Sequence, residues 1–105
     1  MINKIKELLG IKPAADYNQL VKDGATIVDV RSKAEYAQGH IKGSKNIPLP
    51  NLSANPNILK DKNKPIITCC ASGMRSASAK NVLRSNGFIN VHNGGGWASL
   101  NNKIS

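Results

Sequence analysis

The sequence predicts an α/β fold with parallel strands. Short runs of β-branched apolar residues alternate along the chain with polar stretches that are compatible with helices. The runs over residues 26–30 and 65–69 are continuous enough for strands that are buried on both faces of a parallel sheet. Parallel strands that alternate with helices are joined by right-handed crossovers, and such sheets bind ligands at the carboxyl ends of their strands.

The first half of the chain contains two helix starts and two strand signals. Asp16 and Ser32 are each placed to cap a helix, because their side chains accept hydrogen bonds from free backbone N–H groups. The predicted elements are, in order, a helix from Asp16 to about Val21, a strand over 26–30, a helix from Ser32 to Gln38 that Gly39 ends, and a brief strand over 44–47.

The second half contains the most strand-like run of the sequence, 65–69, which places Cys70 at the end of a strand. Pro48 and Pro50 end the brief strand over 44–47. Gly87 ends the helix that begins at Arg75, because glycine adopts a positive φ without strain. The remaining predicted elements are a loose helix over 52–59, a helix that begins at Arg75 and is followed by Asn86 and Gly87, a strand over 88–92, a tight glycine turn over 93–96 and a short helix over 97–101.

The length and composition are those of one globular domain. The chain has 105 residues, and 40% of them are hydrophobic and 20% charged. Cys69 and Cys70 are the only cysteines, and a disulfide between neighbours is strained, so we expect free thiols in a reducing compartment and hence a cytoplasmic protein. The N-terminus has no apolar run of the secretory type, and no stretch reaches the ~18 apolar residues of a membrane-spanning helix.

The chain is strongly basic, with 15 Lys and Arg against 6 Asp and Glu and a net charge of +9. Such an excess attracts anions, and nucleic acids are among them. The lysines are scattered from Lys4 to Lys103, however, and form no basic stripe interleaved with stacking aromatic rings. We therefore expect a solvated surface and no nucleic-acid partner.

The segment 70–76, CASGMRS, places a thiol at the end of a strand, followed by a short loop that opens directly into a helix. Backbone N–H groups of such a loop point inward, and together with the helix dipole they form a cradle for an anion. Gly73 supplies a permissive backbone and Arg75 a fixed positive charge. These effects favour the thiolate form of Cys70, which is the nucleophilic form of cysteine.

Six motifs make the sequence similar to the single-domain rhodanese-like sulfurtransferases, in the order typical of that family. They are D-V-R (29–31), E-Y (35–36), G-H-I-K-G (39–43), N-I-P (46–48), C-x-x-G-x-R-S (70–76) and G-F (87–88). The resemblance implies a rhodanese-like, five-stranded, mainly parallel sheet flanked by helices. It also implies a ping-pong sulfurtransferase without a cofactor, in which Cys70 takes up a sulfane sulfur as a persulfide and passes it on.

On the loop geometry and this resemblance, Cys70 is the predicted nucleophile and Arg75 its electrostatic stabiliser. Cys69 points to the opposite face, because side chains alternate along a strand. No metal site is expected, since the two histidines and two cysteines lack the spacing of metal ligands. The predicted substrate-binding residues are Arg31, Ala71, Ser72, Gly73, Met74 and Ser76.

The sulfur donor stays open at this point. Thiosulfate-using members of the family often carry basic residues inside the loop, whereas here Ala71, Ser72 and Met74 are uncharged. The expected partners are a small donor, either thiosulfate or glutathione persulfide, and a thiol or cyanide acceptor. A second hypothesis is a sulfur-carrier or binding module that a partner protein supplies, with little turnover of small donors. A phosphatase is disfavoured, because the related Cys-x5-Arg loop is one residue longer and forms a wider ring of donors.

The sequence divides into an N-terminal amphipathic segment over 1–12 and a rhodanese-like domain over 13–105. Ile2, Ile5, Leu8 and Leu9 of the segment fall on one helical face. We expect this face to dock on the domain rather than on an acidic membrane surface, because the segment is only about ten residues long.

Overall fold

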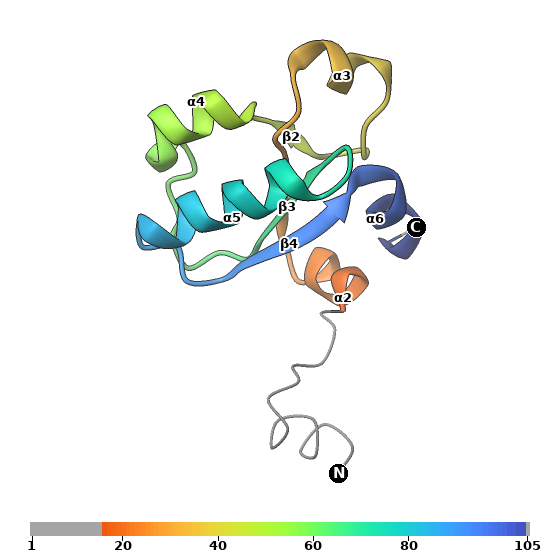
Figure 1. Cartoon of the computed structure of the whole chain (residues 1–105). Coiled ribbons are helices and arrows are strands. Elements are labelled where there is room, and N and C mark those ends of the chain that lie inside the picture. Colours follow the sequence, from red (N-terminus) through yellow and green to blue (C-terminus); the bar gives the residue numbers. More distant parts are fainter. Residues whose placement is uncertain (1–15, 105) are drawn as a thin grey trace, which may run out of the picture.

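A computed structural model describes residues 16–104 of the chain (Figure 1). Its centre is a parallel sheet with the strand order β2-β1-β3-β4. The strands are β1 (Thr26–Asp29), β2 (Lys45–Asn46), β3 (Ile66–Cys70) and β4 (Val91–Gly96). The predicted parallel α/β fold is confirmed, although the part of the chain that is described contains four strands rather than the five expected.

Helices cover both faces of the sheet (Figure 1). They are α2 (Tyr17–Lys22), α3 (Lys33–Gln38), α4 (Leu49–Ala54), the 3-10 helix η1 (Pro56–Ile58), α5 (Met74–Ser85) and α6 (Trp97–Ile104). Helices α4 and α5 pack on one face, whereas α2 and α6 pack on the other. Helix α3 lies beyond the carboxyl ends of the strands, beside the loop that precedes α5 (Figure 1).

Two helix caps form as the sequence predicts. The Asp16 side chain accepts a hydrogen bond from the backbone N–H of Gln19 at the start of α2. Ser32 and Glu35 form a reciprocal capping box at the start of α3, and Gly39 follows the end of that helix. The Glu35 carboxylate that completes this capping box also contacts Arg75, which follows Cys70 in the segment 70–76.

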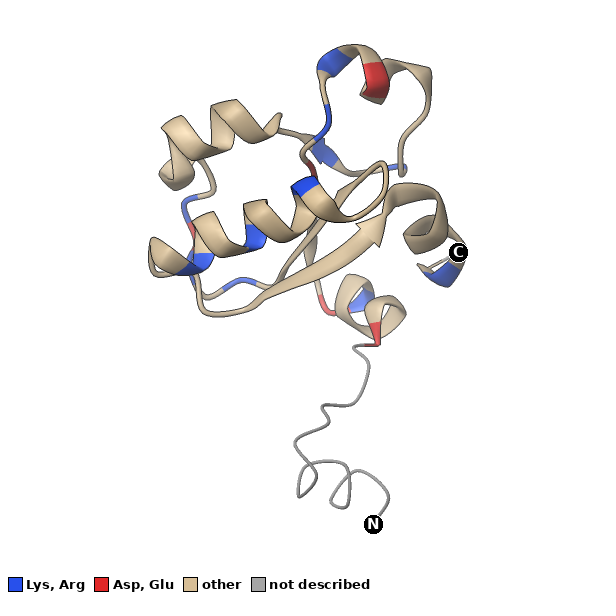
Figure 2. Ribbon diagram, in the orientation of Figure 1, with Lys and Arg blue, Asp and Glu red and all other residues tan. Residues whose placement is uncertain are grey.

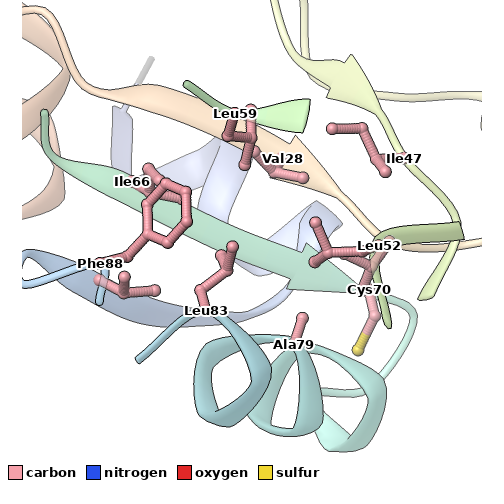
Figure 3. Packing of buried hydrophobic residues seen from close by; sticks show 11 residues of the cluster. Val28, Ile47, Leu52, Leu59, Ile66, Cys70, Ala79, Leu83 and Phe88 are labelled. Atoms are coloured by element: carbon pink, nitrogen blue, oxygen red, sulfur yellow. The ribbon is translucent and has the colours of Figure 1, made fainter. Parts of the chain in front are cut away.

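The central strands divide their side chains between two apolar clusters. Residues Val28, Ile66 and Cys70 belong to the cluster beneath α4 and α5 (Figure 3). The neighbouring residues Ile67 and Cys69 face α2 and α6 instead. This alternation, which every pleated strand imposes, places the two adjacent thiols on opposite faces of the sheet, as predicted.

The segment after β2 differs from its prediction. A loose helix was expected over 52–59, but α4 already begins at Leu49, and η1 follows as a separate turn. Pro50 stands in the first turn of α4, where the missing N–H of proline breaks no intrahelical bond. The two prolines that were predicted to end the strand therefore also start α4, with Pro48 as its N-cap and Pro50 in its first turn.

The glycine segment over 93–96 is strand rather than the predicted turn, and β4 begins at Val91 instead of Phe88. A Cβ atom on Gly94 would lie 2.8 Å from the side chains of Ile67 and Leu100 and from the carbonyl oxygen of Thr68. The absence of side chains thus lets β4 approach β3 closely enough to pair, with an irregular register between Thr68 and Cys70. Helix α6 extends to Ile104 rather than 101.

Basic residues lie on several helices and on the loops between them, and no single element collects them (Figure 2). Within residues 16–104, no helix is long and apolar enough to cross a membrane. The predicted amphipathic segment over 1–12 lies outside the described residues.

Candidate active site

The Cys70 sulfur lies at the carboxyl end of β3 and points toward the first turn of α5 (Figure 3). It accepts hydrogen bonds from the backbone N–H groups of Gly73 at 2.9 Å and Ser76 at 3.3 Å. The residue is only 1% exposed. Two backbone donors and the positive end of a twelve-residue helix therefore converge on a sulfur that little water reaches.

Gly73 allows the loop to turn this sharply. Its φ of 107° lies in the left-handed region, where only glycine is free of strain, and it directly precedes α5. A Cβ atom on Gly73 would lie 3.5 Å from the Cα of Gly95, so the loop packs against the end of β4. The permissive backbone that the sequence predicts at this position is present.

The other predicted substrate-binding residues of the loop surround its opening. Ala71, Ser72 and Met74 are exposed, and Met74 most of all, at 81%. Ser76 is instead completely buried and contributes its backbone N–H to the sulfur. The opening of the loop is thus uncharged and partly apolar, and its interior presents N–H groups.

Arg75 forms a bidentate ion pair with Glu35 of α3. Its two terminal nitrogens donate to the two carboxylate oxygens at 2.6 and 2.9 Å. This hydrogen bonding lowers the pKa of Glu35 from 4.5 to about 2 and raises the pKa of Arg75. The pair ties the loop to α3, and the negative charge of Glu35 balances the cation that the sequence places beside Cys70.

Arg31 lies inside the fold, 4% exposed, and its guanidinium is held from several sides. It donates to both carboxylate oxygens of the fully buried Asp29, with a shortest distance of 2.7 Å, and to the carbonyl oxygens of Glu35 and Gly39. It also stacks on Trp97, 4.9 Å from the ring centroid. These contacts favour a structural role for Arg31 over contact with a donor.

Cys69 shares none of this environment. It is completely buried in the cluster beneath α2 and α6, and burial raises its pKa to about 12. At neutral pH it is therefore a thiol without nucleophilic character.

Two site residues were missed by the sequence reasoning. Thr68 lies on the same face of β3 as Cys70, and Asn93 lies on β4; both hydrogen bond within the network around Ser76. A hydroxyl two positions before Cys70, within an otherwise apolar run, was the available signal for Thr68. Within residues 16–104, no group of three or more His, Cys, Asp or Glu side chains is arranged to hold a metal ion.

The family model of the rhodanese-like domain matches residues 13–103 of the chain. The chain belongs to the rhodanese-like domain family. Thiosulfate sulfurtransferase PspE of Escherichia coli is 36% identical to it over 74 residues, which span 70% of this chain and 71% of PspE. The uncharacterized protein YqhL of Bacillus subtilis is 37% identical over 81 residues, and this match spans 76% of this chain but only 64%, less than two thirds, of YqhL.

Solved rhodanese-like structures share the fold. A structure described as a rhodanese with anions from E. coli is 32% identical, with a TM-score of 0.67, and the match covers 72% of this chain and 91% of that one. The human single-domain sulfurtransferase TSTD1 is 28% identical, with a TM-score of 0.68, and the match covers 83% of this chain and 90% of TSTD1. The family that the six sequence motifs indicate is thereby confirmed.

Glu35→Gln is expected to remove an acid-sensitive part of the stability of this rhodanese-like domain. A carboxyl group whose pKa is lower in the folded chain stabilises the fold above its unfolded-state pKa, and the contribution is lost as the pH falls through the folded-state pKa. For Glu35 this window runs from 4.5 down to about 2. Urea unfolding at a series of pH values should therefore show the stability difference between the wild type and Glu35→Gln shrinking across the window.

Arg75→Gln is the matched control, because it removes the cation and leaves the carboxylate in place. It should lack the largest part of this pH-dependent contribution, and keep the smaller part that comes from the hydrogen bonds of Ser32 to Glu35. A stability difference that stays constant between pH 4.5 and about 2 would contradict the ion pair.

Proposed function

We propose that this rhodanese-like domain is a sulfurtransferase in which Cys70 carries the transferred sulfur as a persulfide. The observation that carries the proposal is the Cys70 sulfur, which accepts hydrogen bonds from the N–H groups of Gly73 and Ser76 at the start of α5. The name of PspE, a thiosulfate sulfurtransferase, supports the same class of reaction. The two free cysteines support a reducing compartment such as the cytoplasm.

In the first step, the Cys70 thiolate attacks the outer, sulfane sulfur of the donor. A bond forms between Sγ and this sulfur while the S–S bond of the donor breaks. The electron pair of that bond leaves as sulfite when the donor is thiosulfate, or as a thiolate when the donor is an organic persulfide. The N–H groups of Gly73 and Ser76 stabilise the anionic sulfur in the reactant and its anionic adduct in the product.

In the second step, cyanide or a thiolate attacks the outer sulfur of the Cys70 persulfide. The new bond to the acceptor forms as the bond between the two sulfur atoms breaks, and Cys70 departs as a thiolate. The same N–H groups stabilise this leaving group. The acceptor gains the sulfane sulfur that the donor has lost, so the cycle balances without a cofactor.

The other predicted site residues have distinct roles in this proposal. Arg75 holds the loop against α3 through Glu35, and its charge acts on Cys70 only together with that of its partner. Ala71, Ser72 and Met74 border the path of the donor and acceptor to the sulfur.

The second candidate function is a sulfur carrier that a partner protein supplies. Arg75 is paired with Glu35 and Arg31 with Asp29, so a carboxylate already balances the charge that each guanidinium would offer to the sulfonate of thiosulfate. Met74, 81% exposed beside the opening, presents a polarizable apolar side chain to a protein surface. These observations favour a donor sulfur that a partner protein carries.

Intact mass measurement distinguishes the two candidates. After incubation with thiosulfate, an enzyme that turns over small donors should gain the mass of one sulfur atom and then release thiocyanate when cyanide is added. A carrier should gain this mass only from a persulfidated protein. A chain that gains no sulfur from thiosulfate, from glutathione persulfide or from a persulfidated protein would contradict the proposed function.

A further inference from the structure

A network of buried and partly buried hydrogen bonds lies behind the Cys70 loop. Thr68 Oγ1 of β3 lies 2.7 Å from Ser76 Oγ of α5, and Ser76 Oγ donates to Asn93 Oδ1 of β4 at 2.6 Å. The backbone N–H of Gly95 donates to the same Asn93 oxygen at 2.9 Å. Thr68 and Ser76 are completely buried. The network therefore joins the three elements that meet at Cys70.

The direction of these hydrogen bonds follows from the groups involved. The Gly95 N–H is only a donor, so the Asn93 atom that faces it is the amide oxygen and not the amide nitrogen. The single hydroxyl hydrogen of Ser76 points to that oxygen. The Thr68 hydroxyl then donates to the Ser76 hydroxyl at 2.7 Å, the Ser76 backbone oxygen at 3.0 Å or the His92 backbone oxygen at 3.3 Å. Hydroxyl groups that each donate to an acceptor inside such a network are held rigidly.

Both donors to Asn93 Oδ1 adjoin a group that contacts the nucleophile. Ser76 supplies one of the two N–H groups that donate to Cys70 Sγ. Gly73 supplies the other, and the Gly73 backbone packs directly on Gly95, where an added Cβ would lie 3.5 Å from the Gly95 Cα. One oxygen atom of Asn93 thus accepts hydrogen bonds from Ser76 and Gly95, which adjoin the two N–H groups that contact the Cys70 sulfur.

We infer that Asn93 is a positioning residue that holds the two N–H donors in place around the Cys70 sulfur. The inference rests on the proposed role of Cys70 as the reactive thiol. By fixing the Ser76 side chain and the Gly95 backbone, Asn93 keeps both N–H groups aimed at the sulfur before a donor arrives. Preorganised donors need no reorientation as negative charge develops, which is why their geometry affects reactivity.

The test is the rate at which iodoacetamide alkylates Cys70 in the full chain at neutral pH. Asn93→Ala should slow this rate roughly tenfold, because the thiolate, the reactive form, loses the alignment of both N–H donors. Ser76→Ala keeps the backbone N–H and the Gly95 contact, so it should slow alkylation less, by roughly threefold. Neither experiment needs a sulfur donor, so a wild-type chain that fails to take up sulfur would refute the proposed function separately.

Peptide mass mapping separates positioning from simple loosening of the fold. Loosening would expose the buried Cys70 and Cys69, so alkylation would become faster and would reach both thiols. Asn90→Ala is the matched control, because the Asn90 side chain contacts His92 Nε2 and not the network, and it should react at the wild-type rate. Wild-type or faster alkylation of Cys70 in Asn93→Ala and Ser76→Ala, or equal slowing in Asn90→Ala, would overturn the inference.

Discussion

Cys70→Ser is expected to abolish sulfur uptake completely. Two backbone N–H groups donate to the sulfur that the proposed transfer uses as its nucleophile, whereas a serine hydroxyl is a much weaker nucleophile and its oxygen does not carry a sulfane sulfur. Intact mass after incubation with a donor measures the effect directly. The wild type should gain one sulfur atom, and Cys70→Ser should gain none.

Cys69→Ala is the control, since it removes the neighbouring thiol from the opposite face of the sheet. It should keep most of the sulfur uptake, because burial raises the pKa of Cys69 to about 12 and leaves it un-ionised. The cavity left by the sulfur should cost about 1–2 kcal/mol of stability. Sulfur addition that persists in Cys70→Ser, or that disappears in a folded Cys69→Ala, would mean that the nucleophile is misassigned or that the thiols act as a relay.

The features that the sequence predicts correctly depend on neighbouring residues. The caps at Asp16 and Ser32 act within one helical turn, and they form as expected. Alternation along β3 alone separates Cys69 from Cys70. The loop at Gly73 follows from a glycine between a strand and a helix. Such local signals already place the Cys70 thiol at the end of β3, beside the start of α5.

The features that it does not predict depend on segments far apart in the chain. In the sequence, Arg75 is a cation of the loop with no acidic residue nearby. Only the fold brings Glu35, 40 positions away, into contact with it. Asn93 reads as part of a turn, because Asn and Gly are turn residues. The close approach of β4 to β3 overrides that local preference and places its side chain beside Ser76. The electrostatics of the site are therefore tertiary properties.

The two arginines of the site differ in how much stability their ion pairs contribute. Both Arg75 and Glu35 are more than one third exposed, so water screens their interaction. Asp29 and Arg31 have side chains that are 0% and 5% exposed, and removal of one partner leaves the other buried without its counter-charge. Removing one partner should therefore destabilise the fold more in the Asp29–Arg31 pair than in the Glu35–Arg75 pair.

Asp29→Asn is accordingly expected to lower the free energy of unfolding by about 3–5 kcal/mol, the cost of leaving a buried charge unpaired. The amide has the shape of the carboxylate but lacks the charge that now holds the Arg31 guanidinium at 2.7 Å. Urea unfolding measures the loss, with Asp23→Asn, which changes an exposed carboxyl at the C-cap of α2, as a control expected to change stability by about 0.5 kcal/mol or less. Adding Arg31→Met to Asp29→Asn should restore part of the loss, because no buried charge then remains. A cost in Asp29→Asn as small as that of the control would show that water reaches the pair, and the interior position of Arg31 would then no longer argue against its contact with a donor.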